Sequence, residues 1–336
     1  AAGQVQLGHG SGGKLSAALV RDHFMPHFSN PALARLADAA VLASPPGELA
    51  ISTDTFVVSP LEFPGGNIGM LAVHGTLNDV AMMGATPVAL TAGFVLEEGL
   101  PLAQLDRIVA SMGQAAAQAG VPLVAGDTKV VERGKADGMF ICTTGIGAVD
   151  PGFHPGPEQA QPGDAVLVSG PIGRHGMAIM TAREGLAFDA AIESDTACLV
   201  PLVTALRQAV GGAVHVLRDP TRGGVASALN EIAAASRVGI QLDQAALPIP
   251  APVEAACEML GLDPLYVANE GILVAMVGSD QAEAALGALR AHPLGREARR
   301  IGTVVATHPG LVAMRTAIGG MRVVDLLPGD QLPRIC

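Results

Sequence analysis

The chain has 336 residues, of which 49% are hydrophobic, and a formal net charge of −11. Its 20 basic side chains and its lack of tryptophan argue against a nucleic-acid-binding surface, and its apolar runs fall well short of the roughly 20 residues that cross a membrane. No signal-peptide pattern opens the chain, and its four cysteines are too widely spaced for a zinc site or a disulfide framework, so we expect a reduced, soluble, cytoplasmic protein.

A glycine-rich segment at 8–14 precedes a predicted helix over 15–20. The N–H groups of Gly12 and Gly13 ahead of that helix, together with the Lys14 side chain, could cradle a phosphate group. The spacing is not that of a P-loop, which needs Gly, four residues and then Gly-Lys-Ser/Thr. A flexible glycine-rich segment that binds nothing is an equal alternative.

Two acidic residues stand inside predicted elements that are otherwise apolar. Asp54 lies near the middle of an alternating strand over 48–58, and Asp79 follows Asn78 within a helix over 66–83. Such an aspartate normally bonds a helix end or a neighbouring loop. A carboxylate among Met and Val side chains is nevertheless costly unless it is paired or binds a metal ion, so both aspartates are candidates for a functional site.

A third aspartate, Asp127, lies at the end of a predicted strand, because the Gly-Asp-Thr-Lys segment at 126–129 directly follows the strand at 122–125. We expect Asp54, Asp79 and Asp127 to converge on one face of a sheet. Their hard oxygen atoms would there suit Mg²⁺ and the phosphates of a nucleotide. The neighbouring elements are predicted as strands over 87–96 and 139–149 and a helix over 102–119.

A segment dense in proline and glycine, 150–163, is the best candidate for a domain boundary. Both halves of the chain show a rhythm of strand, acid-bearing turn and helix, which indicates an α/β protein. We therefore predict an N-terminal domain, a linker, a C-terminal α/β domain and a tail, at residues 1–150, 151–162, 163–325 and 326–336.

In the second half, Asp219 and Arg222 lie in the turn between a strand over 214–217 and a helix over 225–236. The first N–H groups of that helix point into the turn, which suits an anion or a Mg–phosphate group. The alternative is an Asx-Pro turn that only caps the helix. Glu270 precedes a hydrophobic strand, and such an acid is usually solvated, although beside a glycine at a sheet end it often lines a cleft. Further strands or helices are predicted over 165–169, 198–210, 282–291, 301–306, 311–314 and 321–324.

The tail at 326–336 contains two prolines and one glycine, so it can be neither a good helix nor a central strand. We expect a mobile arm with Cys336 at its tip, whose thiol can enter a pocket, react and leave. A frayed terminus with an incidental cysteine is the alternative. Prenylation is disfavoured, because its usual motif places three residues after the cysteine.

Five motifs together resemble the aminoimidazole-ribonucleotide-synthetase-like (PurM-like) superfamily of ATP-using enzymes, namely those at 8–14, 52–55, 77–84, 125–129 and 219–224. Within it, the segment 126–138 and the terminal Pro-Arg-Ile-Cys resemble the HypE family of hydrogenase maturation proteins, and the resemblance covers nearly the whole length. It implies a two-domain α/β (α+β) fold: an N-terminal sheet domain that forms a homodimer, a C-terminal α/β sandwich and a flexible tail. ATP and Mg²⁺ are expected in a cleft between sheet and subunit.

The resemblance also implies a role in making the cyanide ligands of the NiFe-hydrogenase iron. A partner, HypF, would place a carbamoyl group on the Cys336 thiol. ATP-dependent dehydration would turn this thiocarboxamide into a thiocyanate, because transfer of a phosphoryl group makes its oxygen a good leaving group. The cyano group would then pass to iron held by a HypC–HypD complex.

The resemblance assigns roles to the residues singled out above. Cys336 would carry the substrate, Glu270 would be the base for the nitrogen, and Lys129 would contact the phosphates or the carbamoyl oxygen. Arg334 should favour the thiolate of Cys336, and the terminal carboxylate should disfavour it. Expected metal ligands are Asp54, Asp79, Asp127 and Asp219, and expected nucleotide contacts are Gly12, Gly13, Lys14, Asn78, Gly126, Thr128 and Arg222.

Two related families share the acidic motifs. Thiamine-monophosphate kinase has no need of a terminal cysteine. Selenophosphate synthetase usually has a reactive cysteine or selenocysteine in its glycine-rich segment, and 8–14 contains neither. A nucleotide-binding scaffold whose tail only docks on a partner is the non-enzymatic alternative.

Overall fold

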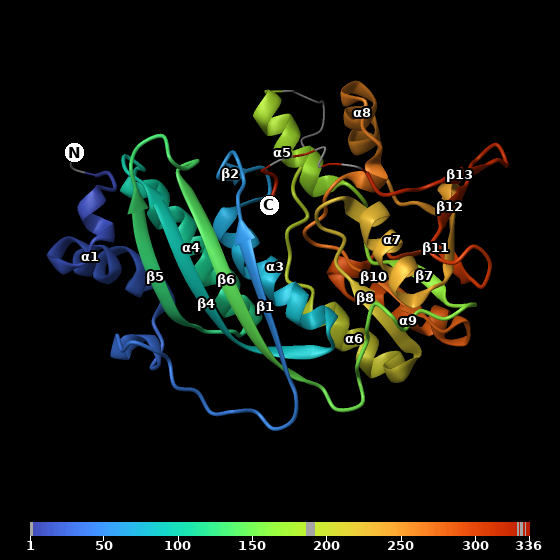
Figure 1. Ribbon diagram of the computed structural model, residues 1–336, viewed down its shortest axis with the longest axis horizontal. Helices are drawn as coiled ribbons and strands as arrows, with labels where there is room; N and C mark the ends of the chain where they lie inside the picture. The colour runs from blue at the N-terminus through green and yellow to red at the C-terminus, as the bar shows by residue number, and fades with distance from the viewer. Residues whose placement is uncertain (1–2, 186–191, 328, 330–331, 333) are drawn as a thin grey trace.

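The computed structural model describes residues 3–185, 192–327, 329, 332 and 334–336. Each half of the described chain contains one large sheet with helices packed on it, and the two halves lie side by side (Figure 1). No helix within these residues is long and apolar enough to span a membrane.

The N-terminal half is built on a four-stranded sheet in the order β1-β6-β4-β5. Strands β4 and β5 run parallel, whereas the other neighbours are antiparallel. The two long helices lie together, and α3 packs directly on β1, β6 and β4. The elements are α1 (Gly13–Leu19), α2 (Met25–Phe28), β1 (Leu49–Phe56), β2 (Glu62–Phe63), β3 (Gly66–Asn67), α3 (Ile68–Met82), β4 (Ala85–Glu97), α4 (Leu102–Ala119), β5 (Leu123–Val131) and β6 (Met139–Val149).

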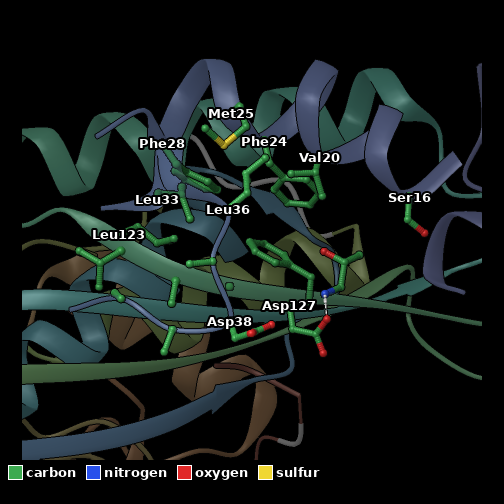
Figure 2. Close-up of a pocket in the computed structure, with 18 of the residues that line it drawn as sticks. Ser16, Val20, Phe24, Met25, Phe28, Leu33, Leu36, Asp38, Leu123 and Asp127 are labelled. Carbon is green, nitrogen blue, oxygen red and sulfur yellow. Dashed lines mark hydrogen bonds between the residues drawn. The ribbon is translucent and has the colours of Figure 1, made fainter. Parts of the chain in front are cut away.

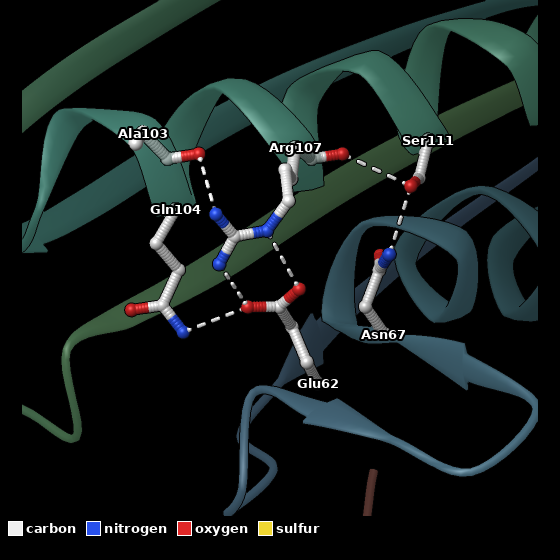
Figure 3. Close-up of polar contacts among 6 residues, drawn as sticks. All are labelled: Glu62, Asn67, Ala103, Gln104, Arg107 and Ser111. Carbon is white, nitrogen blue, oxygen red and sulfur yellow. Dashed lines mark hydrogen bonds and ion pairs between the residues drawn. The ribbon is translucent and has the colours of Figure 1, made fainter.

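Helix α3 is buried on almost every side because it lies between the sheet and the C-terminal half. Its start is fixed by Asn67, whose side-chain oxygen accepts the N–H groups of Gly69 and Met70 at 2.9 and 3.1 Å. The Asn67 amide also donates to Ser111 of α4 at 2.8 Å (Figure 3). Nearby, Arg107 of α4 binds Glu62 of β2 through both of its carboxylate oxygens. These polar contacts set the position of α3, which carries part of the site.

The C-terminal half has a seven-stranded sheet in the order β13-β12-β9-β11-β7-β10-β8. One of its faces forms a core with α6 and α9, and the other forms a core with α7. The elements are β7 (Ala165–Val168), α5 (Arg174–Glu184), α6 (Val200–Val210), β8 (Val214–Arg218), α7 (Gly224–Ser236), β9 (Gly239–Asp243), α8 (Ala251–Leu260), β10 (Val274–Val277), α9 (Ala282–Arg290), β11 (Arg299–Val305), β12 (Val312–Arg315) and β13 (Met321–Val323).

One apolar core joins the two halves. It runs from the side chains under the N-terminal sheet to Met177 of α5 and Val253 of α8, and it includes Leu332 and Ile335 of the tail. Ile335 is only 2% exposed. The end of the chain is therefore part of the packed interior, as Figure 1 shows for the C-terminus between the two halves. Of the expected mobile tail, residues 328, 330, 331 and 333 lie outside the described residues.

The α/β architecture agrees with the sequence-based prediction, and α4 and β6 have the predicted bounds. The prediction was wrong about 126–129, which we expected after the end of a strand. Strand β5 continues through these residues to Val131, because it pairs with β4 as far as Glu97. Strand β10 is also shorter than predicted, so that Glu270 lies in a loop four residues before Val274.

Candidate active site

The last residues of the chain extend the segment that follows β1. Val57 donates its N–H to a main-chain oxygen of Cys336 and Ser59 donates to the Arg334 carbonyl, both at 3.2 Å. Val58 and Ile335 form an antiparallel bridge between these contacts. Backbone hydrogen bonds thus hold the tail in place, and they position Cys336 at the junction of the two halves.

The Cys336 thiol lies beside the carboxyl group of Glu270, and each of the two groups shifts the pKa of the other. Cys336 is partly exposed as a residue, whereas its thiol is enclosed. Burial, and next the neighbouring Glu270, raise the pKa of the thiol well above its usual range. Burial, and next the Asp219 carboxylate, likewise raise the pKa of Glu270 well above its usual range. In its seat the cysteine is therefore a neutral thiol, which is a poor nucleophile.

The cation that favours the thiolate is Arg222 in the loop before α7, not Arg334. The Arg334 guanidinium instead pairs with Asp137 at 3.1 Å. The expectation that Arg334 acts on the thiol was therefore wrong, because the guanidinium is held on the carboxylate of another loop. Burial and the nearby Glu270 outweigh the effect of Arg222, and the pKa of the thiol rises.

Three of the expected aspartates gather beside Glu270 from three different elements. Asp54 comes from β1, Asp79 from the last turn of α3, and Asp219 from the loop after β8. Burial is the first cause that raises the pKa of each of these groups. The pKa of Asp219 rises to about 7, with the Asp79 carboxylate as the second cause. The Asp79 carboxylate accepts a hydrogen bond from Ser52 at 2.7 Å.

This acidic group suits a hard cation. The carboxylate of Asp79 lies near the C-terminal end of α3, where the helix dipole also disfavours negative charge. The nearby Arg218 is engaged with Glu231 at 2.6 Å. Within the described residues, no three such side chains are already arranged as a ligand set. The donors therefore fit Mg²⁺, which usually keeps several water molecules and takes one or two carboxylates together with substrate phosphates.

The acidic group opens on a cavity of about 800 Å³ between the two halves. Its walls include Asp54, Asp79, Asp219 and Arg222. The loop from Asp219 turns into α7 through Gly223 and Gly224, both of which have positive φ angles of 73° and 62°. A Cβ atom at Gly224 would lie 2.5 Å from a backbone oxygen, so the tight turn that aims the start of α7 at this cavity needs glycine there.

A second group of expected residues lies elsewhere. Asp127 and Lys129 on β5 pair with each other at 2.8 Å, beside a separate cavity of about 370 Å³. Figure 2 shows Asp127 across this cavity from the apolar side chains of Phe24 and Phe28. Among the glycine-rich residues, Gly12 lines it as well, and its N–H donates to a serine hydroxyl at 2.9 Å. The other lining residues from the expected set are Gly126 and Thr128.

Strand register shows that Asp127 does not join Asp54 within one chain. Asp127 stands opposite Gly93, Gly93 opposite Cys142, and Cys142 opposite Thr55. Asp127 is thus about 14 Å from β1, which is three strand spacings. It points to the same face as Thr55, and therefore to the opposite face from Asp54. The expected convergence of Asp54, Asp79 and Asp127 was wrong, because β5 forms the far edge of the sheet.

The Asn78 side chain forms hydrogen bonds within the protein interior. Its amide donates to the carbonyl of Ala197 at 3.0 Å and accepts the N–H of Leu199 at 2.7 Å. Both ends of the side chain therefore hold the segment before α6 instead of facing the cavity. The expected role of Asn78 as a nucleotide contact does not agree with this arrangement. Lys14 and Gly13 lie on the exposed first turn of α1.

Sequence reasoning missed three residues behind the thiol and Glu270, which are His175, Ser194 and Asp195. The carboxylate of Asp195 accepts the N–H groups of Glu270 and Gly271 at 3.0 and 3.1 Å. His175 is completely buried and bonds the carbonyl of Ile335 at 2.7 Å. Ser194 and Asp195 precede an apolar helix, a pattern that resembles an ordinary helix cap, so their long-range partners left no signal in the sequence.

Comparison with known families shows which family has this fold. The family model "AIR synthase related protein, N-terminal domain" matches residues 36–149, and the corresponding C-terminal domain model matches 161–313. The chain is therefore a two-domain, PurM-like protein of the AIR-synthase-related class. More narrowly, it belongs to the HypE family of carbamoyl dehydratases, an enzyme family of hydrogenase maturation.

The narrower assignment rests on close relatives. Carbamoyl dehydratase HypE of Cupriavidus necator is 57% identical over 99% of this chain and 95% of the relative. A solved structure of HypE in complex with ATP is 51% identical and covers 98% of this chain and 99% of that chain, with a TM-score of 0.95. The HypE of a solved HypE–HypF complex is 48% identical and covers 92% of this chain and 100% of that chain, with a TM-score of 0.81.

One of the rival families is also a structural neighbour. Thiamine-monophosphate kinase from Stenotrophomonas maltophilia is 24% identical and covers 84% of this chain and 89% of that chain, with a TM-score of 0.64. At this identity the likeness shows a shared fold and no more.

The Asp219→Asn variant should be more stable than the wild type at pH 8 without ligands. The folded-state pKa of Asp219 is raised to about 7 from 3.8. Below about pH 4 the carboxyl group is protonated in both the folded and the unfolded state, so it does not lower the stability of the fold. Between about pH 4 and pH 7 it ionises more readily in the unfolded state, so the free energy of unfolding falls as the pH rises. We expect a gain of about 2–4 kcal/mol in the free energy of unfolding at pH 8 and little gain at pH 4, measured by urea denaturation.

The exposed Asp280→Asn variant is the matched control and should show no gain at either pH. Mg²⁺ at pH 8 should stabilise the wild type more than Asp219→Asn, because a cation neutralises the carboxylate that the variant lacks. An equal gain at both pH values would contradict the buried, uncompensated charge at this position.

Proposed function

We propose that this protein is an ATP-dependent carbamoyl dehydratase that converts a thiocarboxamide on Cys336 into a thiocyanate for NiFe-hydrogenase maturation. One observation carries the proposal. The thiol lies beside Glu270, and the neighbours of Glu270 include Asp54 and Asp219, which line the cleft together with Asp79. A covalent carrier, a base and a phosphate-binding region are thus next to one another, which is what the reaction needs.

The reaction balances in two steps. The γ-phosphoryl group of ATP moves to the oxygen of the thiocarboxamide, ADP leaves, and one nitrogen-bound proton is lost. The C–O bond then breaks and a C≡N bond forms, while the oxygen and the second proton depart as hydrogen phosphate. Phosphoryl transfer of this kind depends mainly on positioning and on neutralisation of charge.

The residues in the cleft have distinct roles in this proposal. Glu270 accepts the proton from nitrogen, since burial makes its carboxylate a stronger base once it is ionised. Arg222 and the start of α7 contact phosphate oxygens. Asp54, Asp79 and Asp219 would hold Mg²⁺, which neutralises charge on the transferred phosphoryl group when bound.

The neutral thiol explains the need for a partner. In its seat Cys336 is a weak nucleophile because burial and Glu270 disfavour the thiolate. Loading of the carbamoyl group is therefore easier once the tail has left its seat. HypF fits the role of donor, since a relative has been solved in a complex with HypF. A HypC–HypD complex would receive the cyano group, and all these steps would take place in the cytoplasm.

A homodimer would reunite the two groups of site residues. The exposed face of the N-terminal sheet carries apolar side chains, with Leu49 and Ile51 exposed by 46% and 66%, which favours a second copy as its cover. The β5 edge of that copy would bring its Asp127 and Lys129 to the acidic cleft. The cavity beside β5, with aromatic walls, would then take the adenine of ATP.

Intact-mass measurements test the proposed reaction. Cyanate adds a carbamoyl group of about 43 Da to a thiol, so wild type and Cys336→Ala can be loaded, desalted and then given Mg-ATP. We expect the wild type alone to lose about 18 Da per chain, as water formally removed, with one ADP released. Loading by HypF with carbamoyl phosphate and ATP should give the same product. An equal loss from Cys336→Ala, or none from the wild type, would contradict the proposal.

Mixed dimers test whether Lys129 acts across the subunit interface. Lys129→Ala and Cys336→Ala should each be inactive alone, because each lacks one part of every site. Random mixing of equal amounts should restore about a quarter of the wild-type rate if Lys129 serves the partner's cysteine. No recovery, with heterodimers verified by native mass spectrometry, would place both residues in one subunit's site or exclude Lys129.

A further inference from the structure

The segment 192–199 connects the tail, the Glu270 loop and helix α3. Three consecutive side chains of this segment each bond a different part of the molecule. Ser194 bonds His175 at 2.8 Å, Asp195 bonds the Glu270 loop, and Thr196 bonds His74 of α3 at 3.0 Å. None of the three is assigned a role by the reaction described above.

The contact of Ser194 reaches the peptide directly before Cys336. The Nε2 atom of His175 lies 2.7 Å from the carbonyl oxygen of Ile335, which can only accept, so Nε2 carries the hydrogen. Burial lowers the pKa of His175 to about 4, and the ring is therefore neutral. Its Nδ1 atom then accepts the hydroxyl hydrogen of Ser194 at 2.8 Å. Ser194 thus fixes the ring in the tautomer that holds the tail.

The contact of Asp195 holds the backbone of the base. Its two carboxylate oxygens accept the N–H groups of Glu270 and Gly271 at 3.0 and 3.1 Å. The residue is partly exposed, but this carboxylate faces inward and is enclosed. The approach is close, because a Cβ atom at Gly271 would lie 1.6 Å from the Asp195 carbonyl oxygen. The Glu270 peptide is therefore held against the segment that also holds the tail.

We propose that Ser194 and Asp195 are positioning residues that set the Cys336 carrier against Glu270. One residue holds the peptide before the cysteine through His175, and the next holds the peptide of the base. The Cα atoms of Ser194 and Asp195 are about 3.8 Å apart across a planar peptide, so the positions from which they hold the tail and the Glu270 loop have a fixed separation. This inference rests on the proposed roles of Cys336 and Glu270, and neither positioning residue touches the thiol.

The first test uses no ATP and no carbamoyl group, so it does not depend on the proposed reaction. Iodoacetamide labelling of Cys336 can be followed on the peptide 330–336, which is released by cleavage before Asp330. His175→Leu and Ser194→Ala should label about tenfold faster than wild type, because the tail loses a hydrogen-bonded support and leaves its seat. His175→Gln should restore slow labelling, since its amide can donate to Ile335 and accept from Ser194.

The matched control is His215→Gln, at a histidine of β8 whose ring bonds Asp164 at 2.8 Å, whereas that of His175 bonds the tail. It should label like wild type. Melting temperatures identify any variant that has lost its fold, and Ser194→Ala removes only one oxygen atom. Wild-type labelling rates in both His175→Leu and Ser194→Ala would overturn the proposal for the tail.

The second test separates Asp195 from the tail. In Asp195→Asn one of the two N–H groups faces an amide nitrogen, so the Glu270 loop shifts while the His175 contact remains. We expect slow labelling of Cys336 but a single-turnover dehydration rate about tenfold or more below wild type, with the KM for ATP unchanged. A wild-type rate in this variant would overturn the role of Asp195, whereas an inactive wild type would overturn the proposed function instead.

Discussion

The burial of several carboxyl groups in one place is the constraint on which the rest of the structure depends. Asp79, Asp219 and Glu270 come from elements far apart in the sequence, and the neighbouring carboxylates raise their pKa values beyond the effect of burial. A fold tolerates such an arrangement only where a partner charge repays its cost. The cleft between the halves is therefore expected to be most stable with a cation and phosphates in it, and this links stability directly to ligand binding.

The tail brings Cys336 next to this acidic group, which is the arrangement that the proposed covalent carrier needs. Backbone pairing with 57–59 and burial of Ile335 hold the end of the chain, and the Cys336 thiol lies enclosed beside Glu270. Because this pairing involves only the main chain, the proposed thiocarboxamide and thiocyanate would be held by the same contacts as the thiol. Burial and Glu270 disfavour the thiolate, so under the proposed function loading and dehydration would take place in two different positions of the tail.

Local patterns in the sequence predicted the strands, the helices and the turns that carry Asp54, Asp79, Asp219 and Glu270. These patterns did not predict the position or role of residues whose contacts are far away in the sequence. Strand β5 pairs with β4 along its whole length, and its place at the far edge of the sheet separates Asp127 from the other acids. Asn78 was expected to contact nucleotide but holds 197–199. The supports at Ser194 and Asp195 depend on contacts across 75 or more residues or on an intervening histidine, which no periodicity records.

The most direct test of the central claim, that Glu270 drives dehydration of a group carried on Cys336, is single-turnover analysis of carbamoylated Glu270→Gln with Mg-ATP. We expect loss of water from the Cys336 adduct to slow about 100-fold or more relative to wild type. The exposed Glu283→Gln variant on α9 should react at the wild-type rate. Dehydration of carbamoylated Glu270→Gln at the wild-type rate would rule out Glu270 as the base, because the thiol would then lie beside a carboxyl group that the reaction does not use.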